Sequence, residues 1–437
     1  MHEALVERPG SCIRRLGGTR AREMQFTRFL RNGSVTASEM SAYAGEATAQ
    51  RVAGREVVAV QDTSAIVLGG RRARAKGFGP VGRGGALGGL LLHPVLAVEA
   101  GTGALLGLVD AQIWNREGGR KVASRRGRAT AQKESQRWLD GMARASELLQ
   151  AAAQITVVAD RESDIYELFA CRPDNLHLVV RVAQDRRIEP EQGEPAKSLL
   201  FAFADALPEQ GRTTVNIPAA PGRAARSAEC ALRFSRVVLS KPLNGAARDL
   251  PAAVSLTLVD IRETSQPAKG EPLHWRLLTS HSVTSPGEAC RVRDFYRQRW
   301  IIEEFFRTLK TAGFNIEDAE IGDCRAMINF LAATTLAAVT VMQLVQARDG
   351  ATDQSLTDAF EPADQALLEA LSAKLEGKTL RQQNPHPRHS LAFAAWVLAR
   401  LGGWTGYYGK PGPRVMRRGL DDFHRVKLGS SLAYTDV

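Results

Sequence analysis

The sequence predicts an α/β protein, and two patterns along the chain indicate it. Between residues 53 and 182, short apolar runs rich in Val, Ile and Leu alternate with helical patterns, which is typical of a sheet with parallel strands. Residues 183–285 instead hold strands separated by Pro and Gly, and the chain is mainly helical from Arg291 onward. We therefore expect an α/β core with a β-strand insertion and with helical N-terminal and C-terminal regions.

The N-terminal part of the chain predicts a short helical region followed by apolar strands. Residues 1–52 contain helical patterns at 22–30 and 37–52. Strands are expected at 57–61, 89–98 and 104–113. Between the first two strands, residues 71–89 are basic and rich in glycine. This segment lacks the GK[ST] ending of a nucleotide-binding loop, so we expect a mobile basic hairpin.

The middle of the chain predicts a basic loop and then alternating strands and helices. Arg116–Arg137 holds eight basic residues among 22, and a helical pattern covers 132–150. A strand at 155–159, a helix at 163–171 and a strand at 176–182 follow. The insertion is expected to be all-β, with strands at 212–217, 228–238, 253–260 and 274–280.

The C-terminal part predicts helices at 291–312, 324–347 and 389–401. Ala326–Ala347 carries no charge over 22 residues, long enough to span a bilayer. It contains six Asn, Thr and Gln side chains and is an isolated run, so we expect a helix buried in a protein core instead. Residues 348–437 are expected to form a helical C-terminal region.

Charge and cysteine content narrow the function classes. The chain has 437 residues and a formal net charge of +11, which attracts polyanions such as nucleic acid. A solvated basic surface without a partner is the alternative. The five cysteines are dispersed and form no CxxC pair, and the N-terminus lacks the apolar run of a signal peptide. These features favour a cytoplasmic protein with reduced thiols.

Four aspartates directly follow or end apolar strands, and they are candidate ligands for a divalent cation. They are Asp62, Asp110, Asp160 and Asp260. Metal-assisted phosphoryl transfer needs carboxylates that converge from different elements, and strand ends of α/β sheets are a common place for them. Turn and helix-cap residues occupy the same positions, so position alone does not choose among the four.

A polar stripe runs along the predicted helix at 294–310. At helical spacing, Tyr296, Arg299, Glu303 and Lys310 share an arc of about 60° beside the apolar face. Glu304 falls outside this arc, so Glu303 is the candidate functional carboxylate. The alternative is a solvated stripe in which Arg299 pairs with Glu303.

The same residues carry a resemblance to a known family. The spacing Y-x2-R-x3-E-x6-K resembles the signature of the DDE transposases of insertion-sequence family four. The likeness spans roughly residues 24 to 410 and includes RFLRNGSV (28–35), QDTS (61–64), KESQRW (133–138), ADRESDIYELF (159–169), PLHWRLLTS (272–280), YRQRWIIEEFF (296–306) and ARLGGW (399–404). It implies an RNase H-like catalytic core over 53–182 and 286–347, interrupted by the insertion at 183–285.

The resemblance also implies roles for individual residues. Asp62, Asp160 and Glu303 match the metal-binding DDE triad, which holds two Mg²⁺ ions per site, with Mn²⁺ as a substitute. Asp110 and Asp260 are then structural.

The remaining matches are DNA contacts. Tyr296, Arg299 and Lys310 would bind phosphates of the transposon end, with Arg161 as a further contact or, alternatively, a cap or ion-pair residue. Trp275 matches the family's base-stacking tryptophan, for which a core position is the alternative, and Trp300 would flank the same strand.

The activity implied is cut-and-paste transposition of double-stranded DNA by a homodimer, associated with the bacterial nucleoid and not with a membrane. The family's end-recognition domain is poorly matched, because only 27 residues precede Arg28 and they lack its basic motif. We therefore also consider a truncated, weakly catalytic protein that binds DNA and regulates transposition through mixed oligomers, and a general metal-dependent nuclease.

Overall fold

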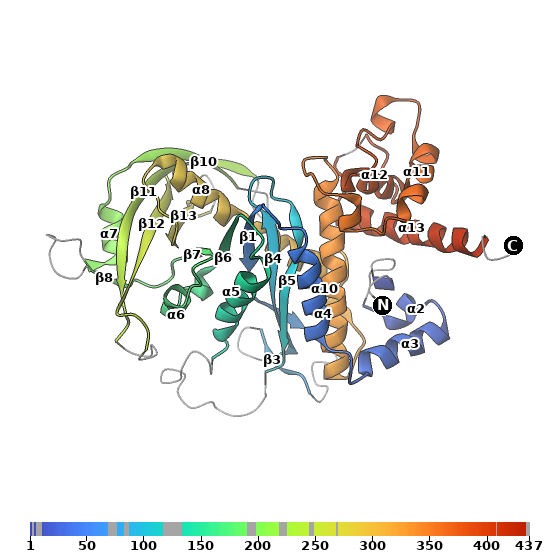
Figure 1. Cartoon of the computed structure of the whole chain (residues 1–437), viewed down its shortest axis with the longest axis horizontal. Coiled ribbons are helices and arrows are strands. Elements are labelled where there is room, and N and C mark those ends of the chain that lie inside the picture. Colours follow the sequence, from blue (N-terminus) through green and yellow to red (C-terminus); the bar gives the residue numbers. More distant parts are fainter. Residues whose placement is uncertain are drawn as a thin grey trace. The chain divides into compact units, whose positions relative to one another are not determined.

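The chain is a mixed α/β protein whose helices and strands form two compact units (Figure 1). The computed structural model describes residues 1, 4–5, 11–68, 77–82, 87–116, 133–189, 198–217, 225–243, 249–267, 270–407 and 409–433. Unit 1 consists of Met1–Ala53, Thr63–Arg120 and Ile301–Val437. Unit 2 consists of Gly54–Asp62 and Lys121–Trp300. The expected basic loop lies largely outside the described residues, at 117–132.

Three parallel strands begin the sheet of unit 2. They are β1 (Glu56–Gln61), β6 (Gln154–Ala159) and β7 (His177–Arg181), in the order β1-β6-β7. Val57 to Gln61 of β1 and Ile155 to Ala159 of β6 are buried without alternation. Continuous apolar burial is expected of parallel strands covered on both faces, and it confirms the strands predicted at 57–61, 155–159 and 176–182.

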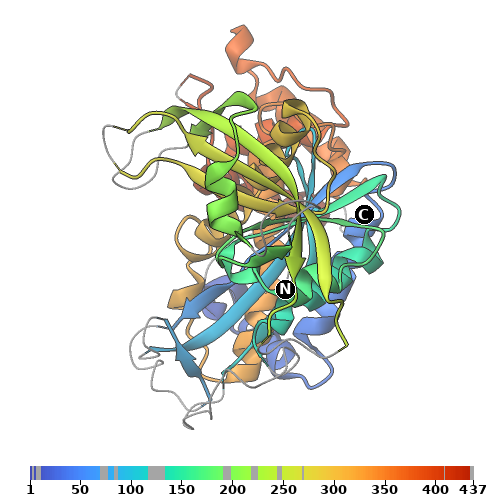
Figure 2. The ribbon, with the colours of Figure 1, turned by 90° about the vertical axis from the view of Figure 1, so that its left-hand side faces the viewer.

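The insertion continues this sheet with antiparallel strands. β13 (His274–Thr279) pairs with β7, and β12 (Ala253–Glu263) and β11 (Arg226–Ser240) follow. The two longest strands of the insertion, β11 and β12, run side by side in Figure 2. The remaining strands are β8 (Arg187–Glu189), β9 (Ser198–Leu199) and β10 (Gly211–Ile217). The all-β expectation is wrong at one place, because the apolar segment Leu200–Ala206 forms the helix α7.

Helices of unit 2 pack on this sheet. α5 (Gln136–Leu148) contacts β1 and β6, and α8 (Pro286–Arg297) contacts β6, β7 and the antiparallel strands. Ser285 and Glu288 form a capping box that starts α8. The helix predicted at 163–171 is instead a 3₁₀ turn, η5 (Arg161–Ser163), followed by α6 (Tyr166–Ala170).

The helix predicted at 291–312 is wrong in one respect, because it is broken. α8 ends at Arg297, and α9 (Trp300–Lys310) begins after a two-residue turn. The amides of Gln298 and Arg299 donate to carbonyls three residues back, 3.1 Å away in each case. This tightening ends the α-helical period, so the arc calculated for an unbroken helix does not relate Tyr296 to Glu303.

Unit 1 contains an antiparallel sheet and most of the helices. Its strands are β2 (Ser64–Val67), β3 (Gly79–Val81), β4 (Leu87–Glu99) and β5 (Leu105–Trp114). β4 pairs with β2, β3 and β5. The expected basic hairpin at 71–89 is therefore partly strand, and its residues 71–76 and 83–86 lie outside the described residues.

One long apolar helix forms the core of unit 1. α10 (Cys324–Ala347) packs against β5 and against neighbouring helices, and two of its buried polar side chains hydrogen-bond other elements. The Asn329 amide donates to the carbonyls of Leu30 and Val35, and the Gln343 amide to that of Leu105. α10 is the one helix among the described residues that is long and apolar enough to cross a membrane, yet 83% of its most apolar stretch is buried. The predicted core helix is confirmed.

Shorter helices complete unit 1. They are α2 (Ile13–Gly17), α3 (Arg20–Arg31), α4 (Ala37–Ala49), α11 (Asp364–Leu375), α12 (Leu391–Leu401) and α13 (Pro413–Ala433). α4 packs on β5, and α10 contacts α3, α12 and α13. α11 and α13 lay in a part of the chain for which only a general helical character was predicted.

Candidate active site

Two aspartates lie at the same edge of the sheet of unit 2. Asp62 directly follows β1, and Asp160 directly follows β6. Because these strands are parallel neighbours, their carboxyl ends meet at one edge. Both side chains are partly accessible, at 23% and 31%. The fold therefore brings two of the four strand-end aspartates together.

Arg299 lies between these two carboxylates. Its Nη1 is 3.2 Å from Oδ2 of Asp62 and 3.9 Å from Oδ2 of Asp160. The residue occupies the turn between α8 and α9 and is only 9% exposed. One guanidinium nitrogen thus offsets the charge of both carboxylates in a poorly hydrated position, where such pairing is worth more than at the surface.

Tyr296 orients Asp160 from the last turn of α8. Its hydroxyl donates to Oδ1 of Asp160 over 3.2 Å. Burial, with a smaller contribution from the Asp160 charge, raises the pKa of the Tyr296 hydroxyl to about 12. The hydroxyl therefore stays protonated near neutral pH and remains a donor.

Two tryptophans extend this cluster. The Trp275 ring meets the Tyr296 ring edge-on at 5.1 Å between centroids, and the Trp300 ring at 6.0 Å. Trp275, on β13, is 6% exposed, whereas Trp300 is half-buried. The burial of Trp275 matches the core position considered as its alternative. A nucleic-acid base would reach Trp300 more readily in this conformation.

Arg161 lies beside this cluster without joining it. It is exposed at the start of η5, directly after Asp160. Within the described part of the chain, no carboxylate forms an ion pair with its guanidinium. Arg161 is thus sterically open to a phosphate.

Glu303 and Lys310 belong to unit 1, whereas the other seven predicted site residues belong to unit 2. Both lie on α9, where Glu303 is exposed one turn after Trp300. The Lys310 ammonium donates to the Ala65 carbonyl over 2.6 Å and lies 3.5 Å from Glu317. Lys310 is thus committed to contacts within unit 1.

Glu304, the neighbour of Glu303, has an ion-pair partner on its own helix. It forms an ion pair with Arg307 on the same helix, with Nε 2.9 Å from Oε2. Adjacent glutamates on α9 therefore have different surroundings, which makes Glu304 a matched control for Glu303.

The sequence analysis missed two features around the site. Arg181 ends β7, the strand beside β6; its guanidinium donates to the His274 carbonyl over 3.2 Å and acts to lower the pKa of the Tyr296 hydroxyl, against the larger effect of burial. Asp164 is fully buried and accepts from Arg186 Nε at 2.9 Å and from the amides of Ala183 and Gln184. The strand-end position of Arg181, in register with the end of β6, is the signal that could have revealed it.

The two other strand-end aspartates have structural partners. Asp110 accepts a hydrogen bond from the Ser41 hydroxyl at 3.0 Å. Asp260 is fully buried and lies 2.7 Å from His274 Nε2 and 3.3 Å from Arg276 Nε. Asp260 lies on β12, which is not adjacent to β1 or β6 in the sheet, and Asp110 belongs to unit 1.

The donor set suits a hard divalent cation only in part. Asp62 and Asp160 offer oxygen ligands of the kind that Mg²⁺ prefers. Among the described residues, however, no group of three or more His, Cys, Asp and Glu side chains lies close enough to hold a metal ion. Of the three carboxylates expected to bind the cation, only those of Asp62 and Asp160, which both lie near Arg299, are arranged as a metal site requires.

Comparison with models of known protein families finds no match to this chain. The function must therefore be argued from the residues and their geometry.

Proposed function

We propose that the chain is a DDE transposase with an RNase H-like core, acting on double-stranded DNA by metal-dependent phosphoryl transfer. The observation that carries the proposal is the pair Asp62 and Asp160 at adjacent parallel strand ends, bridged by Arg299. The motifs that surround these residues resemble those of insertion-sequence family four. Asp62 and Asp160 are separated by 97 intervening positions, and each is accompanied by its own motif, which is hard to obtain from turn residues alone.

Asp62, Asp160 and Glu303 would hold two Mg²⁺ ions, for which Mn²⁺ can substitute. When bound, the ions supply Lewis-acid polarisation of the phosphoryl oxygens. The Tyr296 hydroxyl holds the Asp160 carboxylate in one orientation through Oδ1 and leaves Oδ2 toward Arg299. The ligand oxygens are therefore positioned before any ion binds, which is the usual requirement for an efficient site.

Arg299 would exchange its carboxylate partners for a DNA phosphate. A guanidinium matches the geometry of carboxylate and phosphate equally well, since both accept two parallel N–H bonds. Cations on Asp62 and Asp160 would remove the charge that now holds Arg299. Arg161 would add a contact to phosphate and Trp300 a contact to an unstacked base, whereas Lys310 would reach a phosphate only after releasing Ala65 and Glu317.

The reaction sequence implied is strand nicking, hairpin formation, hairpin opening and strand transfer. Each step exchanges one phosphodiester P–O bond for another, with water or a DNA 3′-hydroxyl as nucleophile. No covalent bond to the protein is needed, so none of the hydroxyl side chains is assigned as a nucleophile. The helical region at 348–437 would supply the contacts of a homodimer on DNA, in the bacterial cytoplasm and on its nucleoid.

Cleavage of the DNA that flanks the gene tests the proposal. A supercoiled plasmid carrying this flanking DNA, incubated with the protein and Mg²⁺, should yield 3′-hydroxyl nicks and then hairpin ends. Asp62→Asn, Asp160→Asn and Glu303→Gln should each abolish cleavage, whereas the neighbouring Glu304→Gln should retain it. Cleavage that survives all three substitutions would remove these carboxylates from the active site.

A second candidate is favoured by the contacts of Arg299. Since its guanidinium already occupies the space beside both aspartates, a chain that keeps this arrangement would bind DNA without cutting it. Such a protein would regulate transposition through mixed oligomers. Tight DNA binding without Mg²⁺-dependent cleavage would support this candidate, and inhibition of an active relative in trans would separate it from an inactive enzyme.

A further inference from the structure

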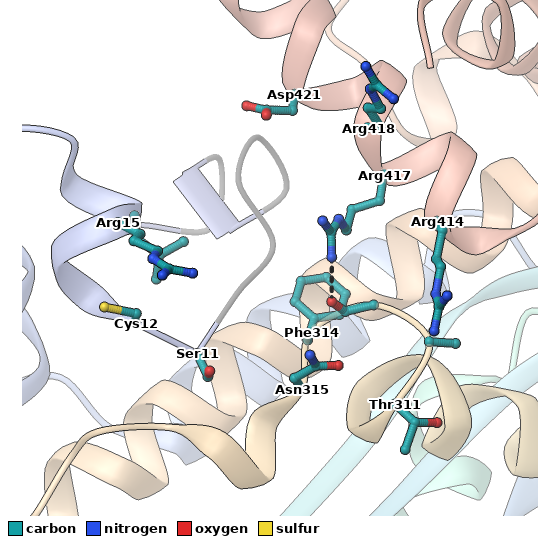
Figure 3. Close-up of a pocket in the computed structure, with 13 residues that line it drawn as sticks. Ser11, Cys12, Arg15, Thr311, Phe314, Asn315, Arg414, Arg417, Arg418 and Asp421 are labelled. Atoms are coloured by element: carbon teal, nitrogen blue, oxygen red, sulfur yellow. Dashed lines mark hydrogen bonds between the residues drawn. The ribbon is translucent and has the colours of Figure 1, made fainter. Parts of the chain in front are cut away.

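Unit 1 contains a cavity of about 680 Å³ that is lined by four arginines (Figure 3). Arg414, Arg417 and Arg418 come from the first two turns of α13, and Arg15 comes from α2. The turn after α9, at residues 311–315, forms the floor. Figure 3 shows Arg15 extending toward the side of the cavity from which Arg414 and Arg417 enter. Two helices distant in sequence thus direct cations into one cavity, and a third segment forms its floor.

Among the residues that the structure describes, few groups compensate the charges of this cavity. Among the described residues, no carboxylate forms an ion pair with any of the four guanidinium groups. Arg417 donates to the Gly313 carbonyl over 2.8 Å, which holds its side chain against the floor. Asp421 is the one carboxylate in the lining, and it lies 2.7 Å from Arg425 on the same helix.

The position of these arginines is unfavourable for α13 itself. The amino end of a helix carries partial positive charge from its unpaired N–H groups, so acidic residues are favoured there and basic residues are not. α13 has no acidic residue in its first turn and places three arginines in its first two turns. The helix end and the arginines therefore attract the same kind of ligand, an anion.

We propose that this cavity binds phosphates of a duplex DNA backbone. The inference rests on the proposed function, because a net charge of +11 and a DNA substrate make the phosphodiester the expected anion. A guanidinium group binds two non-bridging oxygens of a phosphate at once. Arg414 and Arg418 line the cavity and are exposed, so a DNA backbone could bind them and extend beyond the cavity. The site would fix the position of DNA on unit 1 without reading its sequence.

Salt-dependent binding to duplex DNA provides the first test. Arg414→Gln/Arg418→Gln should lower the affinity at least about tenfold at 0.1 M salt. It should also reduce the slope of log K against log salt by about two, because two counterion-releasing contacts are lost. The matched control is Arg381→Gln/Arg388→Gln, which removes the same charge from exposed positions of unit 1 outside the cavity. Equal losses in both double variants would overturn the proposal, since they would reflect net charge alone.

Cys12 provides a readout that needs no catalysis. It lines the cavity and is partly accessible, whereas Cys171 is exposed in unit 2. Saturating duplex DNA should slow maleimide labelling of Cys12 at least about fivefold relative to Cys171, as measured by peptide mass spectrometry. Labelling of Cys12 that DNA does not change would overturn the proposal. Protection by pyrophosphate but not by DNA would overturn it as well, and would indicate a site for a free anion.

The two proposals can fail separately. Glu303→Gln should bind DNA and protect Cys12 like the unmodified chain even though it does not cleave. If the unmodified chain shows cavity-dependent DNA binding but no Mg²⁺-dependent cleavage, the transposase proposal fails and the cavity proposal stands. If cleavage occurs while the cavity variants bind DNA normally, the reverse holds.

Discussion

At the scale of single residues, the site of unit 2 is organised by buried cations and hydroxyls around carboxylates. Arg299 forms ion pairs with Asp62 and Asp160, and the Tyr296 hydroxyl donates a hydrogen bond to the other oxygen of Asp160. A similar arrangement occurs four residues after Asp160, where Arg186 donates a hydrogen bond to the buried Asp164. In each case the cost of burying a charge is offset by a specific partner, and removal of that partner should be expensive.

Removing the partner of Asp164 should test this directly. Arg186→Met would leave a fully buried carboxylate with only its amide donors, so the free energy of unfolding should fall by about 3 to 5 kcal/mol. Arg144→Met is the control, because the Arg144–Glu147 pair is exposed and should contribute less than about 1 kcal/mol. Urea unfolding measures both, and similar losses in the two variants would contradict the prediction.

His281 should make unit 2 sensitive to acid. Burial, and secondarily the neighbouring His177, lowers the pKa of the His281 imidazole to about 3, and its ring stacks on that of His177 at 4.0 Å between centroids. The unfolded chain therefore binds a proton that the folded chain resists. The resulting stability is complete above about pH 6.5 and is lost as the pH falls toward 3.

The contribution lost between pH 6.5 and 4 should be about 3 kcal/mol. His281→Gln should lower stability at pH 7, because the ring packing is lost, but should flatten the pH dependence over this interval. Thermal unfolding at several pH values checks this. A variant as acid-sensitive as the unmodified chain would assign the effect to other groups.

At the scale of elements, strand ends and helix starts place the site residues. The amino end of α8 is fixed by the capping box of Ser285 and Glu288, and its carboxyl end carries Tyr296. Three turns of helix therefore connect a capping motif on one side to the hydroxyl that orients Asp160. A substitution in the capping box should therefore displace Tyr296 only slightly, because α8 is also held by its packing on β6 and β7.

The capping box of α8 should make a measurable contribution to the free energy of unfolding. Ser285→Ala removes the acceptor for the Glu288 amide and should cost about 1 kcal/mol. Ser285→Asn retains a capping oxygen and should remain within a few tenths of a kcal/mol of the unmodified chain. Chemical denaturation distinguishes them, and an equal loss for both substitutions would show that the cap contributes nothing.

The strands and the central helix could be predicted from the sequence, because continuous apolar runs and one uncharged segment are strong local signals. The break at Gln298 and Arg299 could not, since the segment from Asp294 to Lys310 contains neither Pro nor Gly. A pattern in sequence also says little about which face of a strand is covered. The sequence around Trp275 fits a core position and a surface position equally well. In the structure its side chain is buried and packs against Tyr296.

The residues of the site were likewise predicted from local patterns only in part. Strand ends predicted four candidate aspartates, and the parallel pairing of β1 with β6 brings Asp62 and Asp160 together. Arg181 was missed because an arginine at a strand end does not by itself indicate a site, and the pairing of β7 with β6 that places it there is known only from the fold.

At the scale of the whole molecule, the positive charge should dominate association with DNA. With a net charge of +11, six or more phosphate contacts are expected, so affinity for an unrelated duplex should fall about 10³-fold or more between 50 and 200 mM salt. Fluorescence anisotropy with a labelled duplex measures this. A slope of log K against log salt shallower than about two would contradict an extended backbone interface.

The division of the chain between the two units has a consequence for biosynthesis. Unit 2 takes its first strand, β1, from residues 56–61, and its next strand, β6, begins only at Gln154. Unit 1 depends on α10, which is translated after almost all of unit 2. Domains usually fold as their segments leave the ribosome, in order from the amino terminus. Here β5, which is largely apolar, must wait on the nascent chain for more than 200 residues before α10, the long helix that packs on it, emerges. Slow translation should therefore favour aggregation of the nascent chain, and chaperones that shield apolar strands should improve its yield.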